Sequence, residues 1–514
     1  MNVSRISSTI RRLLILTIVL ATVASAYGQK RVKLKDADLL KSGKKGDQRY
    51  QRLIGNVVFV QNQTTIYCDS AHFYKKDNSL EAFGNVRIIE GDSITITGTR
   101  LVYDGDEKIA KLRKNVVFTK LKTATLYTNN LDYERPANQA YYFNGGKLVD
   151  SINVLTSKKG YYNVNSNLAS FKTEVVVTNP DYTMFADSMQ YNSRTKDIFF
   201  VTKTTVINKD SSRIVYEGGK YNTITKKSDL HEGVGESGDY TLEGDEYDLD
   251  AIRNIAKVRG NVVMTSKKEN LIIYGQASDY FKNKGITKVY NKAFVAKITE
   301  DKDTLFMTAD TLVSIDNKDA AKKRILAYHN VKIYKKDLQG TADSLEYRAA
   351  DSTIYFYKDP VLWTQGNQLT ADSISMLIEN NTISKMYLLD NAFVISQDTL
   401  QNFNQIKGRV MTAEFANQKI NRVIVQGNGE SLYFALNDDQ ALMGMNKIIC
   451  SNITIRFKEG KVNNLSFYVK PEASFIPPHE LKKEDKTLKG FEWKGENKPT
   501  REDVVKGVIG KGAY

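Results

Sequence analysis

Apolar and polar residues alternate over most of the chain with the two-residue period of β-strands, in which successive side chains point to opposite faces. The stretch GNVVFV at residues 55–60 shows the pattern, and variants of it return from Phe83, Arg113, Arg259 and Tyr328. In each copy one parity stays apolar, whereas the other admits Arg, Lys, Thr and Tyr. We predict that the apolar parity faces the interior. It comprises Val57, Phe59, Val86, Ile88, Val116, Phe118, Val262, Met264, Val331 and Ile333.

The copies recur at a fixed interval. The asparagine of the motif stands at positions 56, 85 and 115, which are 29 and 30 residues apart. A second motif keeps the same phase and consists of a small residue followed by Asp-Ser or Asp-Thr, as at Cys68, Ala186, Ala309, Ala342 and Ala371. A period of about 30 residues indicates a repeat architecture whose units bury their apolar faces against their neighbours. We therefore expect an elongated all-β repeat fold in which each repeat adds one rung.

Short polar residues mark the places where the strands bend. Gly55 and Asn56 tolerate unusual backbone angles, so the Gly-Asn pair suits a bulge. Asp69 and Ser70 can hydrogen-bond their own backbone, so the Asp-Ser pair suits a second bend. Stacked carboxylates could instead hold a metal ion, but these recur with the fold period rather than gathering once. That recurrence favours a structural role.

The first 26 residues differ from the rest and predict a secretory signal peptide. Three arginines precede an apolar run at residues 13–24, and Ala24-Ser25-Ala26 offers a cleavage site. The run is shorter than the roughly 20 residues that span a bilayer.

Glycines accumulate near residue 235, and four of the seven prolines lie after residue 470. The expected organisation is a signal peptide at 1–26, a short linker at 27–44, repeats in two parts at 45–235 and 236–470, and a polar tail at 471–514. This tail, with the aromatic pair Phe491 and Trp493, is either flexible or a docking peptide.

The charge balance favours anionic partners. The formal net charge is +15, and removing Arg5, Arg11 and Arg12 with the signal peptide leaves 15 − 3 = +12. Lipid headgroups and phosphorylated sugars fit such a surplus, whereas export argues against nucleic acid. The alternative is that the lysines only keep the surface soluble and protect strand edges.

Few residues suggest catalysis or cofactor binding. Cys68 and Cys450 both occupy the small-residue position of the second motif, so we predict two buried free thiols rather than a disulfide. The four histidines lack metal-ligand spacing. A GxGxxG match at residues 233–238 lacks the flanking strand and helix of a dinucleotide site, and we predict a loop there. The carboxylates at 243–250 lack calcium-loop spacing and suggest a solvated strand face. We expect neither cofactor nor metal.

The two interlocked motifs, GNVVF and TADSLEY at a period of about 30 behind a signal peptide, resemble the OstA/LptA family of lipopolysaccharide-transport proteins. The resemblance covers most of residues 45–460. It implies a periplasmic, open β-jellyroll shaped like a taco shell, whose inner apolar surface holds the acyl chains of lipopolysaccharide. It also implies partners of the same jellyroll type, joined through terminal strand edges.

The resemblance implies a non-enzymatic lipid carrier of outer-membrane biogenesis, and physical chemistry is consistent with the lipid-carrying part. Acyl chains exposed to water cost about 0.8 kcal/mol per CH₂ group, so a transport path needs a continuous apolar groove. The inward column beginning at Val57 and Phe59 is the candidate groove. Two alternatives stay open, a structural solenoid or adhesin and a β-helix enzyme that degrades polysaccharide. Alternation alone cannot separate an open groove from a closed core, because both require the same pattern, and oligomeric state is left open.

Overall fold

The computed structural model describes residues 31–91, 94–120, 124–150, 152–299, 301–417, 419–458 and 461–506. The predicted signal peptide lies outside the described residues. The chain divides into two compact units. Unit 1 comprises residues up to 210 together with 222–224, and unit 2 comprises residues 211–221 and 225 onward. The division therefore falls somewhat before the joint expected at residue 235.

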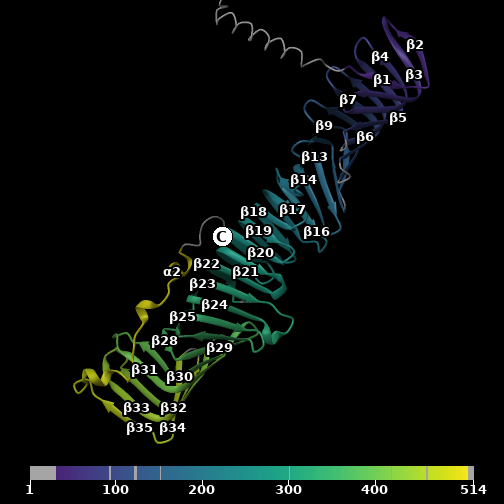
Figure 1. Ribbon diagram of the computed structural model, residues 1–514. Coiled ribbons are helices and arrows are strands. Elements are labelled where there is room, and N and C mark those ends of the chain that lie inside the picture. Colours follow the sequence, from purple (N-terminus) through teal and green to yellow (C-terminus); the bar gives the residue numbers. More distant parts are fainter. Residues whose placement is uncertain are drawn as a thin grey trace, which may run out of the picture. The chain divides into compact units, whose positions relative to one another are not determined.

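Unit 1 consists of antiparallel β-strands (Figure 1). The strands are β1 (Lys33–Asp36), β2 (Leu39–Lys45), β3 (Gln48–Gln61), β4 (Thr64–Tyr74), β5 (Ser79–Glu90), β6 (Ile94–Asp104), β7 (Ile109–Lys120), β8 (Ala124–Glu134), β9 (Gln139–Tyr142), β10 (Gly146–Asp150), β11 (Asn153–Ser157), β12 (Lys159–Asn163), β13 (Leu168–Asn179), β14 (Tyr182–Asn192), β15 (Asp197–Phe200) and β16 (Thr204–Asn208). The predicted linker thus contains β1 and β2, which both pair with β3.

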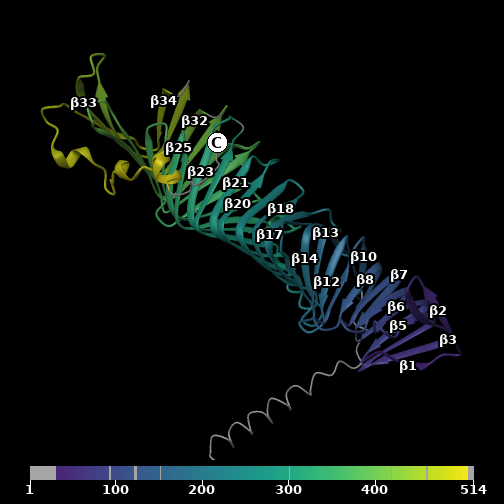
Figure 2. The same cartoon turned by 90° about the horizontal axis from the view of Figure 1, so that it is seen from above.

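Unit 2 continues the same arrangement, and its strands β20 to β25 lie side by side in Figure 1 and in Figure 2. The strands are β17 (Arg213–Asn222), β18 (Lys227–Ser237), β19 (Tyr240–Asp250), β20 (Ile255–Ser266), β21 (Leu271–Phe281), β22 (Ile286–Ile298), β23 (Thr304–Ile315), β24 (Arg324–Lys335), β25 (Leu338–Arg348), β26 (Thr353–Tyr357), β27 (Val361–Thr364), β28 (Asn367–Thr370), β29 (Ser373–Glu379), β30 (Thr382–Gln397), β31 (Phe403–Ala416), β32 (Lys419–Leu436), β33 (Leu442–Lys458), β34 (Lys461–Tyr468) and β35 (Glu472–Ile476). Short helices are η2 (Lys282–Lys284), η3 (Ala320–Lys322), η4 (Lys483–Lys486), η5 (Gly495–Asn497) and α2 (Arg501–Val505).

The all-β repeat fold predicted from the sequence is confirmed, but each repeat contributes two strands rather than one rung. β3 pairs antiparallel with β4, and β4 pairs with β5, through short hairpins. One repeat of about 30 residues therefore holds one strand with the Gly-Asn motif and one with the Asp-Ser motif. The expectation of one rung per repeat was wrong. Consecutive strands are antiparallel, so the chain needs two strands before it runs again in the same direction as at the start of the repeat.

A β-bulge bends each long strand. Ile54 pairs with Ser70 and Val57 with Cys68, so two residues of β3 face the single residue Asp69 of β4. The two extra residues, Gly55 and Asn56, are left-handed, with φ values of 78° and 45°. A bulge of this kind increases the local bend, and Gly and Asn reach left-handed angles more readily than other residues.

Both sequence motifs meet at this one bend, so the expectation of a second bend for Asp-Ser was wrong. Asn85 Nδ2 donates a hydrogen bond of 2.9 Å to Asp69 Oδ2 on the neighbouring strand. A Cβ atom at Gly84 would overlap the same carboxylate, which explains why glycine precedes the asparagine. The same Asn to Asp bond joins Asn56 to Asp38, Asn261 to Asp245, Asn330 to Asp310 and Asn391 to Asp372.

The bend divides each sheet into two half-sheets that face each other. We call the one containing residues 57–61 of β3 the A half and the one containing residues 48–54 the B half. Phe59 of the A half packs against Phe73 of the B half with ring centroids 5.2 Å apart, and Leu53 is fully buried on the B half. The core therefore lies between the two halves, and their free hairpin ends form two rows that we call the A lip and the B lip.

The GxGxxG match forms strand, not the predicted loop. It lies on β18, where Gly233 pairs with Gly244 of β19. The rings of Tyr216 and Tyr247 occupy the space beside Gly233, and Tyr247 donates a hydrogen bond of 2.6 Å to the Gly233 carbonyl. Glycine is present because two tyrosine rings need the room that a side chain would fill.

The segment predicted as a polar tail packs on the outer face of unit 2. In Figure 1 it runs from beside β33 past β28 to α2 next to β22 and β23. Leu488, Phe491 and Trp493 join an apolar cluster with Phe393 and Phe434, and Val504 and Val505 of α2 contact Phe294 and Phe306. Composition left two interpretations open, a flexible tail or a docking peptide, and in the structure the segment is docked.

Candidate functional site

The structure turns all of the predicted groove residues inward, but it buries them to different degrees. In unit 1 the six predicted residues are 5% exposed or less, and they are Val57, Phe59, Val86, Ile88, Val116 and Phe118. In unit 2, Val262 and Val331 are each 1% exposed and Ile333 is 6% exposed, whereas Met264 is only half-buried. The difference follows from how the two lips are joined in each unit.

We call the side where the A lip and the B lip face each other the mouth. In unit 1, polar side chains join the two lips across this mouth. The strongest contact is an ion pair between Glu90, at the end of β5 on the A lip, and Arg135, which follows β8 on the B lip. Arg135 Nη2 lies 3.0 Å from Glu90 Oε1, and both side chains are largely buried. Arg135 Nη1 also donates to the hydroxyl of Tyr103, which in turn donates to Gln61. Burial raises the pKa of Tyr103, so the phenol stays neutral and can donate.

Equivalent contacts follow at the repeat interval, and we call them the latches. Each joins an A-lip position to a B-lip position that is 44 to 47 residues later in the chain. Their A-lip members are residues 32, 61, 90, 120 and 150, which are 29, 29, 30 and 30 residues apart. The latches are Val32 N to Asn78 Oδ1 (2.9 Å), Gln61 Nε2 to the Gly105 carbonyl (2.7 Å), Glu90 with Arg135, Lys120 Nζ to the Val164 carbonyl (2.6 Å) and Asn167 Oδ1 (2.8 Å), and Lys196 Nζ to Asp150 Oδ2 (2.8 Å).

Behind the first latches the interior of unit 1 is packed solid. Phe59, Leu80, Ile88 and Ile96 lie close to the mouth and are at most 1% exposed. Burying such a side chain stabilises a protein by about 1.5–3 kcal/mol, so exposing these four would cost about 6–12 kcal/mol. That sum is as large as the whole stability of a typical domain, about 5–15 kcal/mol. This stretch of unit 1 is therefore a closed core and not an open groove.

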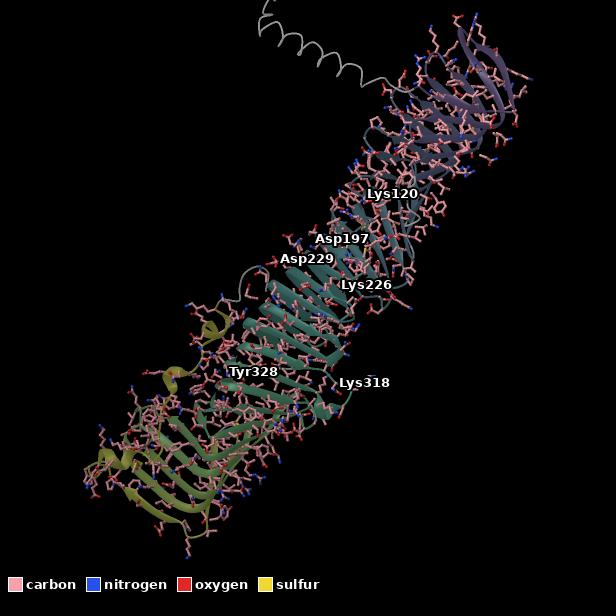
Figure 3. All side chains as sticks on the ribbon, in the orientation of Figure 1. Lys120, Asp197, Lys226, Asp229, Lys318 and Tyr328 are labelled. Atoms are coloured by element: carbon pink, nitrogen blue, oxygen red, sulfur yellow. The ribbon has the colours of Figure 1, made fainter. Side chains whose placement is uncertain are left out.

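Farther along unit 1 a pocket interrupts the packed core. Its cavity volume is about 40 Å³, and it is lined by aromatic and aliphatic residues that include Phe118, Tyr142, Tyr162 and Phe171. Lys120, labelled in Figure 3, belongs to its lining and forms the latch to Asn167.

In unit 2 the inner wall is partly open to solvent. Met264 pairs with Ile273, Ile273 with Val295, and Val295 with Met307, so the four side chains form one row across neighbouring strands of the A half. All four are half-buried. Residues nearer the bend, such as Val262 and Ala293, are 1% exposed. Exposure that rises from the bend toward the lip is the geometry of an open V.

The B half of unit 2 shows the same gradient. Phe356 and Ile374 are at most 1% exposed, whereas Ile354 and Ile378, which share their parity but lie nearer the B lip, are half-buried. Each half-sheet of unit 2 thus presents apolar residues that solvent can reach, the A half on β20–β23 and the B half on β26 and β29. This pair of walls is the candidate functional site, and we call it the open groove.

Hairpins of unit 2 make polar contacts along their own lip. On the A lip, Lys335 Nζ lies 2.6 Å from Asp301 and 2.8 Å from Asp337. The hydrogen bond from Lys335 lowers the pKa of Asp301 to about 2. On the B lip, Asn283 Nδ2 donates to the Arg253 carbonyl at 3.4 Å. These bonds stiffen each lip while the walls between them stay accessible.

Sequence reasoning missed most of the open groove. Ile273, Val295 and Met307 occupy strands whose Gly-Asn motif is absent or degraded, so a search by motif passes over them. Their alternation with outward residues was the available signal. The latches were also missed, although Gln61, Glu90, Lys120 and Asp150 share the repeat interval.

Other candidate chemistry is structural. Cys68 and Cys450 are free, buried thiols, as predicted, and burial raises the pKa of Cys68 to about 12. The acidic residues at 243–250 belong to β19, where Glu243, Asp245 and Asp248 are exposed. Among the described residues, no group of three or more His, Cys, Asp or Glu side chains is placed to hold a metal ion. Within the same residues, no helix has the length and apolar character needed to cross a membrane.

Two family models and one solved structure indicate what this chain is similar to. The model of the OstA-like protein family matches residues 29–187, and the model of the LptA and LptD N-terminal domain family of LPS transport proteins matches residues 293–382. One similar solved structure is LptH of Pseudomonas aeruginosa, described as the LptA-homologous periplasmic component of the lipopolysaccharide transport device. It shares 16% identity over 23% of this chain and 82% of its own, with a TM-score of 0.21. No curated protein matches the sequence.

The fold defines a repeated β-jellyroll with two facing half-sheets. Over residues 29–187 and 293–382 the chain is therefore OstA/LptA-like. One family model matches within unit 1 and the other within unit 2.

Proposed function

We propose that the protein is a non-enzymatic lipid carrier of outer-membrane biogenesis, and that the open groove of unit 2 holds the acyl chains of lipopolysaccharide. The observation that carries the proposal is the row Met264, Ile273, Val295 and Met307, which is apolar, continuous and half-buried. An apolar wall that water can reach is unfavourable unless a ligand covers it, and acyl chains gain about 0.8 kcal/mol for each CH₂ group that it shelters.

Basic residues near the groove suit an anionic lipid. Lys267 and Lys268 are exposed on the A lip directly after β20, and Lys297 lies on the same parity as Val295 at the end of β22. The phosphate groups of a lipid headgroup at the rim would meet these ammonium groups while the acyl chains lie between the walls. The net positive charge of the chain favours the same orientation.

Likeness to this family supports a place in the periplasm and partners of the same jellyroll type. β1 and β2 form the first edge of unit 1, and β34 and β35 pair with β33 at the far end of unit 2. Leu39 and Leu40 on β2 are 44% and 48% exposed. Strand addition at such edges would join this protein to neighbouring jellyrolls through backbone hydrogen bonds.

Site-specific photo-crosslinking in cells tests the groove. A photo-reactive residue at Met264 or Ile273 should yield lipopolysaccharide adducts, because both side chains face the open groove. Thr265 and Ile272 are their outward neighbours on the same strands and provide matched controls. Adducts at the outward positions only, or at none of the four, would contradict the proposal. Normal surface lipopolysaccharide after depletion of the protein would argue against a transport role even if lipid bound.

A further inference from the structure

We infer that the β3–β6 stretch of unit 1 is a permanently closed plug, latched across its mouth, and that lipid enters and leaves this protein without passing through that stretch. The inference rests on the proposed lipid-carrying function and limits where the cargo can travel. It differs from the expectation, drawn from the sequence, of one groove that runs through all the repeats.

The latches form a regular series along unit 1 and are not isolated surface contacts. They recur at the interval of the repeat, and each links one lip to the other. Gln61 is 2% exposed, and the side chains of Arg135 and Glu90 are 11% and 20% exposed. Charge-assisted hydrogen bonds are roughly twice as strong as neutral ones, and removing one partner of a buried pair leaves the other charge without compensation.

The N-terminal residues of the described chain reinforce the closure. Val32, just before β1, is 5% exposed and donates its backbone N–H to Asn78 on the B lip. Asn78 also donates to Asp106, and a Cβ atom at Gly105 would overlap Val32. Val32 thus fills part of the space between the lips.

The interior leaves no room for cargo behind these contacts. The fully buried side chains of this stretch include Leu53, Phe59, Leu80, Ile96 and Leu101, drawn from both half-sheets. An acyl chain could enter only by displacing this packing. The residues of the open groove in unit 2, by contrast, are half-buried before any ligand binds.

A comparison of photo-crosslinking in the full-length protein tests the plug. A diazirine amino acid is placed at Phe59 or Ile88 in unit 1 and at Met264 or Ile273 in unit 2. We expect the yield of lipopolysaccharide adducts at the unit 2 positions to exceed the yield at the unit 1 positions by at least about tenfold. Equal labelling of both units would overturn the plug and leave the proposed function standing. Absence of adducts at all four positions would overturn both.

Covalent closure of the mouth gives an independent test. Cysteines replace Glu90 and Arg135 and are joined with dibromobimane, while the native Cys68 and Cys450 are buried and Cys68 has a raised pKa. The locked protein should deliver lipopolysaccharide to the surface at the level of the wild type. Loss of delivery on locking, with delivery kept in each single-cysteine variant treated with the same reagent, would show that the mouth opens and would overturn the inference. Asp150→Cys with Lys196→Cys repeats the test at another latch, so a folding defect at one pair does not decide the result.

Discussion

At the scale of single residues, the fold depends on one recurring contact at the bend. The left-handed backbone at Gly84 and Asn85 creates the bulge, and the Asn85 side chain ties it to Asp69 on the next strand. Each part of the two motifs has a separate physical task. Glycine leaves room for the carboxylate, asparagine accepts the angle and donates the bond, and aspartate accepts it.

Replacing Asn261 separates the two tasks of the asparagine. Asn261→Ala should lower the free energy of unfolding by about 1–2 kcal/mol, because it loses both the left-handed preference and the 2.8 Å bond to Asp245. Asn261→Gly keeps the backbone freedom and should lose only the part due to the bond, about 0.5–1.5 kcal/mol. Urea denaturation of both variants measures the difference. Equal stability of N261A and the wild type would refute the assigned role.

Gly84 tests the steric part of the same contact. Gly84→Ala should destabilise more than Gly91→Ala, by about 1–3 kcal/mol, because a methyl group at Gly84 overlaps Asp69 while one at Gly91 meets open space. Both glycines are left-handed, with φ values of 71° and 53°, so backbone strain is matched. The two variants are compared by thermal unfolding. Adding Asp69→Ala to G84A should recover part of the loss, and no recovery would mean that the carboxylate is not the obstacle.

At the scale of elements, glutamine side chains hold the C-terminal segment on the sheet. Gln405 of β31 is fully buried, and its amide donates to the Lys486 carbonyl and accepts from Leu488 N. Gln368 of β28 bonds in the same way to Glu492 and Lys494. A side-chain amide with one donor and one acceptor thus imitates the edge of a neighbouring strand.

Removing this clamp should release the segment. Gln405→Ala leaves the buried N–H group of Leu488 without its partner, at about 1–3 kcal/mol, and removes the part-buried bond to the Lys486 carbonyl. Trypsin cleavage between residues 482 and 489 should then accelerate by about tenfold or more, since 1.4 kcal/mol corresponds to a factor of ten. Gln426→Ala, at an exposed position of β32, is the control. An unchanged cleavage rate in Q405A would show that the apolar contacts alone hold the segment.

The stability of unit 2 should depend on pH through Asp301 on its A lip. Its pKa is lowered from 3.8 to about 2 by the hydrogen bond from Lys335, so the folded state favours the charged form. The resulting stability is present above pH 3.8 and is lost as the pH falls through about 2. The wild type should exceed Asp301→Asn in unfolding free energy at pH 6 and lose that advantage at pH 2, as measured by urea denaturation at each pH. Asp438→Asn, in an exposed hairpin, is the control, and a pH-independent difference between wild type and D301N would contradict the assignment.

At the scale of the whole molecule, one repeat serves two purposes. In unit 1 polar latches close the mouth over a packed core, whereas in unit 2 the lips bond along themselves and the apolar walls stay accessible. The same bend and the same alternation underlie both. The two units differ in the polar residues at the ends of their hairpins.

Hydrogen exchange should reveal this difference between the units. Backbone amides of β5 and β6 lie over a closed core and should exchange mainly through global unfolding. Amides at the lip ends of β21 and β22 should exchange faster, because their walls are solvent-accessible and open locally. Mass spectrometry of peptic peptides measures both sets, and comparable protection at the two places would argue against an open groove in unit 2.

Much of the fold could be predicted because its signals are local and periodic. The alternation around Val57 and Phe59 identified the inner wall, and the small-residue position identified Cys68 and Cys450 as buried thiols. The strand count per repeat was missed because the two motifs were assigned to different bends, although they bond to each other across neighbouring strands. The sequence could not decide whether the C-terminal segment is flexible or docked, because Gln405 and Gln368, which hold it, are more than 80 residues away in the chain.

The sequence by itself determined the strands, the period and which side chains point inward, because these follow from nearest-neighbour alternation and from the backbone angles that Gly and Asn allow. Only the tertiary structure decided whether the inward side chains line a core or a groove. That outcome depends on whether an A-lip residue such as Glu90 meets a partner such as Arg135, 45 residues later, across the mouth. Contacts over such separations are set by the stacking of repeats, so no single repeat shows in its own sequence whether it is closed or open.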